Sequence, residues 1–411
     1  MISYKNSIKI LKKSKIKIDD EIIKVNNCIN RVVANNIFSK VNNPAADNAA
    51  FDGFVINSKD TKNLNIKKKG LFKIIGTIAA GDKTINKKSK KFQTYEIMTG
   101  SIIPKGFDTI IPIENIVFYP NKKNPKYILI DKKIKKHQHI RFKGSDYKKN
   151  DLLIKKGTIL LPVHILALKS LGIDSVKVKR KPNILFFSTG NEISNQKKIP
   201  DWKVRNSNSY YINSLSNNFL FNFTNGGTLK DNHLIRFEKE IKKMFKSKTD
   251  IIITSGAVSA GKFDFIPNIV KKNKLSNYFK GVAIRPGKPI LFAKIKGKQK
   301  VIFGLPGNPI SSAACFRFFV YPYLLLILDM KNDEPFKAKL KSNFKKKFFF
   351  TRFLKAKISN NNKKGIMEVE ILKDQESFKI KSFTTANAWA LLKNGKSTFK
   401  KGELIDCFHL I

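Results

Sequence analysis

The feature that most constrains the fold is an alternation of short apolar runs and helical patterns that begins at Pro182. The runs "NILFF", "DIII" and "VIFG" have the length of buried strands, while "HLIRFEKEIKKMF" and "PISSAACFRFFVYPYLLLIL" have the apolar spacing of helices. Strands that alternate with helices usually form a parallel sheet covered on both faces. The pattern predicts an α/β domain with a mainly parallel sheet over residues 181–332.

The rest of the chain predicts three further parts, so the expected fold class is multidomain α/β. Residues 51–140 are short β-like runs between Gly, Pro and Lys clusters, which predict a nested β-rich lobe. Residues 1–50 are expected to be helical segments with polar breaks and, with residues 141–180, to form a helical linker domain. Short strand-like runs return near the end, which predicts a small C-terminal β domain over residues 333–411.

The strands of the predicted sheet are followed by small, hydroxyl and acidic residues. Ligands bind at the carboxyl ends of the strands in an open parallel sheet, so these loops are expected to converge on one edge. Small residues let the backbone approach a ligand, and helix N-termini favour anions. The residues concerned are Thr189, Gly190 and Glu192 after the first strand, Asp231 after the strand-like run "FNFTNGGTL", Ser255, Gly256, Ser259, Gly261 and Asp264 after "DIII", and Pro306, Gly307, Asn308 and Pro309 after "VIFG".

Each loop also has an ordinary structural explanation. Asp231 would cap a helix, and Asn308 would cap another with Pro309 at its first position. Arg285 and Lys288 in "VAIRPGKP" are either solvated charges of a hairpin or contacts to a phosphate or another oxyanion. Four such loops in one α/β unit favour a binding site over independent turns.

The formal charge of +51 would suit a polyanion ligand, but lysine supplies most of it and is spread from end to end. AT-rich codons explain that spread better than nucleic-acid binding, since no recognition helix or RNA-binding motif is present. The three cysteines form no C-x-x-C or zinc spacing, which indicates a reducing, cytoplasmic location. No uncharged apolar stretch of about 20 residues predicts a membrane span.

Six segments together resemble a known family. They are "PAADNAAFDGF", "IMTGSIIPKGFDTIIPIE", "FFSTGNEI", "DIIITSGAVSAGKFDF", "VAIRPGKP" and "GLPGNPISS", in that order from Pro44 to Ser312. The set resembles the molybdopterin molybdenumtransferases, the molybdenum insertases of molybdenum cofactor biosynthesis, to which the gephyrin E domain is related. The resemblance covers most of the chain.

The resemblance implies a reaction and an assembly. Adenylylated molybdopterin and molybdate would be the substrates, molybdenum would be inserted at the dithiolene, and AMP would be released with the help of Mg²⁺. The family is dimeric, with its site between the α/β domain of one subunit and the nested lobe of the other. The adenylyltransferase that makes the substrate and acceptor molybdoenzymes are candidate protein partners; no specific nucleic acid and no membrane are expected.

The resemblance also carries roles to particular positions. Hard Mg²⁺ prefers carboxylate oxygens, which fits Glu192 and Asp231 as its ligands. Arg285 and Lys288 would supply positive charge to the anionic substrates. Catalytic roles fall on Asp52, Thr99, Glu192, Asp231 and Asp264, and substrate contacts on Arg141, Asp146 and the remaining loop residues named above.

Some positions depart from the family pattern. Ala49, Phe51 and Ala257 stand where the family usually has serine, methionine and glycine, and "QESF" at 375–378 replaces a Q-G-S-G segment. Three other functions are compatible with parts of the sequence. A molybdopterin adenylyltransferase-like enzyme would be a short single-domain protein. A gephyrin-like scaffold would need extra domains. A non-catalytic polyanion-binding protein is suggested by the charge alone, and it would show salt-dependent DNA binding.

Overall fold

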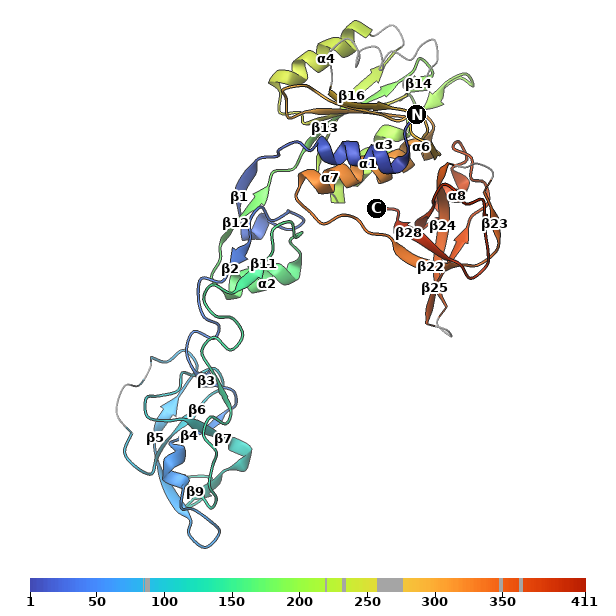
Figure 1. Cartoon of the computed structure of the whole chain (residues 1–411). Coiled ribbons are helices and arrows are strands. Elements are labelled where there is room, and N and C mark those ends of the chain that lie inside the picture. Colours follow the sequence, from blue (N-terminus) through green and yellow to red (C-terminus); the bar gives the residue numbers. More distant parts are fainter. Residues whose placement is uncertain are drawn as a thin grey trace. The chain divides into compact units, whose positions relative to one another are not determined.

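The computed structural model describes residues 1–411 except 84, 86–88, 219, 231–233, 257–275, 347–349 and 362–364 (Figure 1). The chain divides into two compact units. The first comprises Met1–Asn35, Lys156–Leu161 and Val176–Ile411, and the second comprises Asn36–Lys155 and Pro162–Ser175. The predicted boundaries at residues 50 and 141 fall inside the second unit and stay a prediction.

A six-stranded sheet forms the centre of the α/β region. Four neighbouring strands are parallel, and the last two are antiparallel additions at one edge. The prediction of a mainly parallel sheet is therefore confirmed. The strands in spatial order are β16 (Asn222–Leu229), β13 (Asn183–Thr189), β17 (Ile251–Ser255), β21 (Val301–Leu305), β20 (Leu291–Lys294) and β18 (Ser276–Lys280).

Helices cover both faces of this sheet because adjacent strand residues point to opposite sides. Phe186 of β13 joins the core cluster that includes Ile212, whereas Phe187 packs edge-on against Phe237 with ring centroids 6.0 Å apart. Figure 1 shows α4 on one side and α1, α3, α6 and α7 on the other. These helices span Tyr4–Lys13 (α1), Asn208–Asn218 (α3), Leu234–Lys246 (α4), Pro309–Cys315 (α6) and Tyr321–Ile327 (α7).

The long apolar helix predicted after "VIFG" runs from Pro309 to Ile327, with a π-helical turn at Phe316–Val320 between α6 and α7. By length and composition this helix could cross a membrane, but 83% of its most apolar window is buried inside the protein. Its side chains belong to the same core cluster as the sheet. Its apolar character is therefore explained by the core of the α/β region.

The helical prediction for residues 1–50 is wrong beyond the first helix. Only α1 is an α-helix there; Ser3 caps its start, and it ends at Lys13. The β-branched run that follows forms β1 (Asp20–Lys24), which pairs with β12 (Ser175–Lys179). Isoleucine and valine favour strands where a pairing partner exists, and here the partner comes from a distant part of the sequence.

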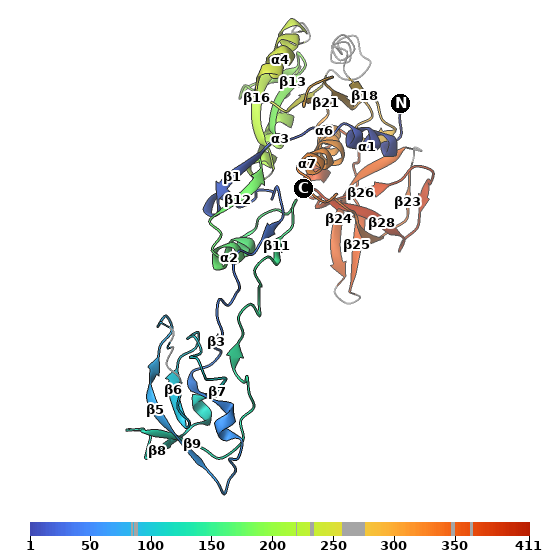
Figure 2. The same cartoon turned by 60° about the vertical axis from the view of Figure 1, so that its left-hand side comes forward.

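The second unit has a six-stranded sheet, which confirms the β-rich lobe (Figure 2). A short antiparallel ribbon of β3 (Asn48–Ala49) and β10 (Ile140–Arg141) leads into it, β2 (Ile37–Phe38) pairs with β11 (Leu152–Ile154), and α2 covers Pro162–Ser170. The sheet consists of β7 (Thr109–Pro112), β4 (Gly53–Ile56), β6 (Gln93–Ile97), β5 (Gly70–Ile78), β9 (Tyr127–Ile130) and β8 (Val117–Tyr119) in spatial order.

The last residues form the predicted small β domain. Its sheet closes on itself because β24 pairs with both β25 and β26, and closure leaves few exposed edges. β19 (Ile284–Arg285), from the α/β region, adds to β24 and joins the two regions. The strands around the closed sheet are β24 (Thr351–Asn361), β25 (Ile366–Ile371), β22 (Phe336–Leu340), β28 (Leu404–His409) and β26 (Ala388–Leu392).

Candidate functional site

Three of the predicted loops meet at one edge of the parallel sheet. Ser188 lies opposite Ser255, and Ser255 lies opposite Leu305, so the strands β13, β17 and β21 end together. The loops enclose a pocket of about 460 Å³. The predicted residues that line it are Thr189, Gly190, Glu192, Ser255, Gly256, Gly307, Asn308 and Pro309.

Gly256 fits against the neighbouring loop so closely that it needs to be glycine. Its φ is +102°, and a Cβ there would lie 2.5 Å from both the carbonyl oxygen and Oγ1 of Thr189. The Gly256 N–H donates to the Leu305 carbonyl at 2.8 Å, and Thr189 Oγ1 donates to the Ser255 carbonyl at 3.0 Å. One backbone bond and one side-chain bond thus hold the three loops together and leave main chain at the pocket wall.

Among the residues that the structure describes, Glu192 is the one predicted acidic residue of the α/β region that lines the pocket. Its carboxylate lies over Gly190, where a Cβ would come within 2.4 and 2.5 Å of the two carboxylate oxygens. The Gly190 N–H donates to the Leu229 carbonyl at 3.0 Å, which ties this turn to β16. Gly190 therefore leaves room for the acidic side chain to lie flat against the backbone.

Sequence reasoning missed the role of Asn208. Its Nδ2 donates to Ser255 Oγ at 2.6 Å and to the Gly307 carbonyl at 2.8 Å, so one side chain joins two of the loops. An Asn at the start of a helix ordinarily caps it, so the sequence alone gives no sign that this side chain joins two loops. α3 begins at Asn208, and its side chain faces the pocket.

Arg205 and Asn206 also line the pocket without having been predicted. Asn206 Oδ1 accepts from Ser188 Oγ at 3.0 Å, and Arg205 donates to the Lys197 carbonyl at 2.9 Å. Their only sequence signal was a cluster of amide and hydroxyl residues before α3. Arg205 places a cation in the same pocket as Glu192.

Asn308 links this pocket to the C-terminal domain. It occupies the N-cap position of α6 and Pro309 the first helical position, as the sequence suggested, but its side chain makes no capping bond. Asn308 Nδ2 donates to Ser377 Oγ at 3.2 Å, and the Ile310 N–H donates to the Ser377 carbonyl at 3.2 Å. The altered "QESF" segment therefore keeps a serine in contact with this loop.

A second pocket, of about 510 Å³, lies beside the first and shares Asn308 with it. Arg285 and Lys288 line it together with Pro306 and residues 375–378. Arg285 lies opposite Arg352 in the pairing of β19 with β24. Burial lowers the pKa of Arg352, and the charge of Arg285 lowers it further. Arg285 and Lys288 suit an oxyanion, and Glu376 adds one carboxylate to the pocket lining.

The second unit brings together another predicted pair. Asp52 Oδ1 accepts hydrogen bonds from the backbone N–H and from Oγ1 of Thr99, each at 2.7 Å. These bonds lower the pKa of Asp52, the backbone bond having the larger effect. Asp146 accepts from Asn43 Nδ2 at 2.8 Å, and Arg141 lies opposite Asn48 in the β3–β10 ribbon.

Several predicted residues lie outside the described part of the chain. They are Asp231, Ser259, Gly261 and Asp264, together with the substituted position Ala257. Within the residues that the structure does describe, no group of three or more His, Cys, Asp and Glu side chains is placed to hold a metal ion. The predicted carboxylate cluster of the α/β region is thus represented only by Glu192.

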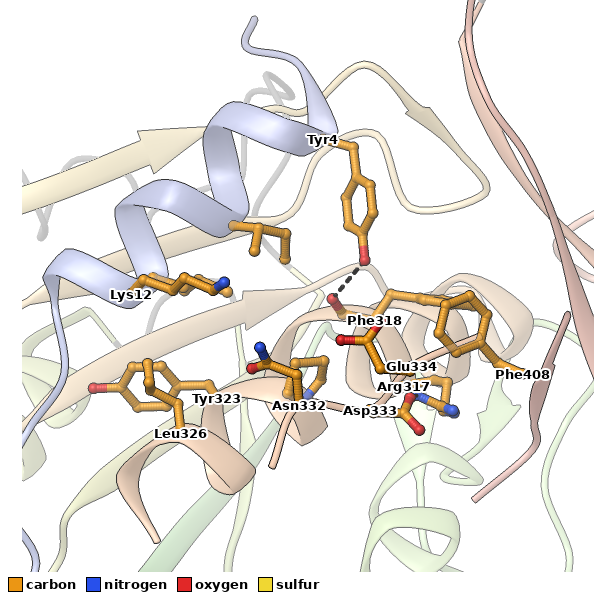
Figure 3. Close-up of a pocket in the computed structure, with 13 residues that line it drawn as sticks. Tyr4, Lys12, Arg317, Phe318, Tyr323, Leu326, Asn332, Asp333, Glu334 and Phe408 are labelled. Carbon is orange, nitrogen blue, oxygen red and sulfur yellow. Dashed lines mark hydrogen bonds and ion pairs between the residues drawn. The ribbon is translucent and has the colours of Figure 1, made fainter. Parts of the chain in front are cut away.

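A smaller pocket of about 200 Å³ lies between α1 and the Pro309–Ile327 helix, and no predicted site residue lines it (Figure 3). The hydroxyl of Tyr4 donates to the Phe318 carbonyl at 3.4 Å. Arg317, only 2% exposed, donates to the His409 carbonyl at 2.8 Å and pairs with Asp333 at 2.6 Å. These bonds attach the final strand, β28, and the segment around Asp333 to the helix. The residues of this pocket therefore have a structural role.

Comparison with known proteins covers the chain almost from end to end. Residues 2–172 match the MoeA N-terminal region (domain I and II), 186–325 a probable molybdopterin binding domain, and 337–410 the MoeA C-terminal region (domain IV). A molybdopterin molybdenumtransferase of Staphylococcus epidermidis (strain ATCC 35984) is 30% identical over 413 residues, covering 98% of this chain and 94% of that protein. One from Staphylococcus aureus (strain COL) is 30% identical over 92% of this chain and 88% of its own length.

The fold agrees with this relationship. The crystal structure of the molybdopterin biosynthesis moeA protein from Pyrococcus horikoshii OT3 matches with a TM-score of 0.84 and 25% identity, covering 100% of both chains. The match includes all the parts described above, so the resemblance predicted from the six segments is confirmed. The chain belongs to the MoeA family of molybdopterin molybdenumtransferases.

Proposed function

We propose that this protein inserts molybdate-derived molybdenum into adenylylated molybdopterin and releases AMP. The observation that carries the proposal is the convergence of three strand-end loops on one pocket, with Gly256 packed against Thr189 and Asn208 bridging to Gly307. Main-chain groups and hydroxyls at the carboxyl ends of parallel strands suit the phosphate part of such a substrate.

The neighbouring cationic pocket supports the same proposal. Molybdate and the adenylyl phosphates are anions, and Arg285 and Lys288 line the pocket where they could stabilise them. Arg352 lies opposite Arg285 in the neighbouring strand. Arginine can bind an oxyanion through two N–H groups, whereas lysine acts as a point charge. Because Asn308 lines both pockets, a substrate in one would lie next to an anion in the other.

Magnesium is part of the proposal, with Glu192 and Asp231 as its protein ligands. Mg²⁺ is usually bound by one or two carboxylates together with substrate phosphates, and the carboxylate of Glu192 lines the pocket. Asp231 lies outside the described residues, so its part in this ligand set rests on the sequence. When bound, the ion would neutralise phosphate charge, while Glu192 itself holds and orients it.

The active form is proposed to be a cytoplasmic homodimer with a composite site. Chemistry-bearing residues occur in both units, Asp52 and Thr99 in one and Glu192 in the other. Mixing an Asp52→Ala variant with an Asp231→Ala variant should restore part of the lost activity, since some heterodimers would carry one intact site. No recovery after verified subunit exchange would argue for a site within one subunit.

The direct test of the function is a turnover assay with adenylylated molybdopterin, following AMP with and without molybdate. We expect AMP release that depends on molybdate and magnesium, and partner molybdoenzymes should accept the product. An adenylyltransferase-like enzyme would instead consume ATP and make the adenylylated pterin. Binding to random DNA without either activity would favour a polyanion-binding protein.

Asp231→Asn separates capping from catalysis. Asparagine caps a helix about as well as aspartate but cannot offer the same charge to a cation. We expect a thermal midpoint close to the parent and a fall in turnover of roughly 10²-fold or more. A variant that releases AMP at the parental rate in limiting magnesium would show that Asp231 only caps.

A further inference from the structure

Trp202 is the more exposed of the two tryptophans and comes two positions before Val204, which lines the candidate site. Its side chain is 71% exposed, whereas Trp389, the other of the two tryptophans, is fully buried. Large aromatic side chains bury much apolar area when they pack, so an indole left this exposed gains little from folding. Core packing therefore does not account for an indole at this position.

The backbone after Trp202 leads directly into the pocket wall. Val204 and Arg205, two and three positions later, both line the pocket with Glu192. The Val204 N–H donates to the Glu192 carbonyl at 2.8 Å, and β14 (Ile193–Ser194) pairs with β15 (Val204–Arg205). Trp202 is thus carried on a loop that is fixed to the pocket at both of its ends.

The indole also has a cation over its face. Lys203 Nζ lies 4.5 Å from the centre of the Trp202 ring and donates a hydrogen bond to the Asn191 carbonyl. A cation over the face of a tryptophan is an attractive contact. The lysine therefore links the ring to the loop that carries Glu192, a residue of the pocket wall.

We infer that Trp202 is a stacking platform for a planar nitrogen heterocycle of the substrate. This inference rests on the proposed function, whose substrate carries two such rings, the pterin and the adenine, attached to phosphates. With the phosphates against the glycine-rich edge, a ring that extends from the pocket would meet the indole. Trp202 would thereby favour the adenylylated pterin over ring-free phosphates.

The test compares the affinities of the parent, Trp202→Ala and Trp202→Phe for AMP, ribose 5-phosphate and 6-hydroxymethylpterin by calorimetry. Loss of one base–aromatic stack should weaken binding of the stacked ring roughly 5- to 100-fold in the alanine variant. Affinity for ribose 5-phosphate should not change, and phenylalanine should restore most of the loss. Tyr210→Ala, another aromatic with 65% exposure, is the matched control.

A weaker affinity for AMP alone would identify adenine as the ring, and a weaker affinity for the pterin alone would identify the pterin. Acrylamide quenching gives a second readout, because the ring should shield Trp202 while Trp389 is already buried. Unchanged affinities for both rings in Trp202→Ala, with parental AMP release, would overturn this inference and leave the proposed function standing. A parent that binds neither ring and releases no AMP would contradict both.

Discussion

Gly256 offers the sharpest prediction, because an added methyl group has nowhere to go. In Gly256→Ala the Cβ would meet the Thr189 carbonyl oxygen and Oγ1 at 2.5 Å, with φ at +102°. A side chain at such a φ costs about 1–3 kcal/mol, and overpacking adds a similar amount. We expect a loss of about 3 kcal/mol in the free energy of unfolding of the α/β region.

The matched control is Gly307→Ala on the same edge of the sheet. Its Cβ would lie 3.7 Å from the Cα of Gly256, an ordinary contact, and its φ is not positive. Calorimetry should show the unfolding transition of the α/β region lowered by roughly 6–12 °C in Gly256→Ala and little changed in Gly307→Ala. Hydrogen exchange at the residue 256 amide, which donates to the Leu305 carbonyl, should quicken only in the first variant.

Equal midpoints for Gly256→Ala and the parent, with equal protection of that amide, would refute this reasoning. Such a result would mean that the Thr189 and Gly256 loops can separate at no cost. The interlocked edge would then not be a fixed part of the folded protein.

Three other perturbations address different parts of the chain. Asn208→Asp removes the NH₂ donor to Ser255 and Gly307, and should lower the free energy of unfolding by about 1–3 kcal/mol and abolish most of the AMP release. Asn213→Asp, on the exposed face of α3, should change neither quantity. Thr99→Val removes one of the two hydrogen bonds that lower the pKa of Asp52, so this pKa should rise in an NMR titration. Ionised Asp52 stabilises the folded state above its unfolded pKa, and on acidification the variant should lose this stabilisation at a higher pH than the parent. An unchanged titration would contradict that assignment. Asp250→Asn removes the charge and one of the two oxygens that accept 3.0 Å bonds from Arg180, and should cost about 2–3 kcal/mol in denaturant unfolding. An equal loss in Asp174→Asn, which weakens an exposed pair with Lys169, would show that burial is not the cause.

Most of the α/β fold could be predicted because its signals are local. The runs "NILFF", "DIII" and "VIFG" became β13, β17 and β21, and the apolar spacing of "HLIRFEKEIKKMF" became α4. Buried parallel strands are apolar along their whole length, and an amphipathic helix shows its period directly. That these strands end together at one edge followed from their expected parallel arrangement alone.

What the sequence did not show depends on contacts between distant residues. Asn208 was not singled out because its partners, Ser255 and Gly307, are brought to it only by folding. Arg352 became relevant only when β19 paired with β24. The strand β1 was mistaken for part of a helical segment, since its partner β12 lies far along the chain.

We propose that the edge formed by β13, β17 and β21 binds the adenylylated substrate. A crystal structure of the protein with AMP would show the binding position. We expect the AMP phosphate in the pocket lined by Gly190, Gly256 and Asn308. AMP ordered instead in the pocket between α1 and the Pro309–Ile327 helix, with nothing at the sheet edge, would show that the substrate does not bind where β13, β17 and β21 end (Figure 3).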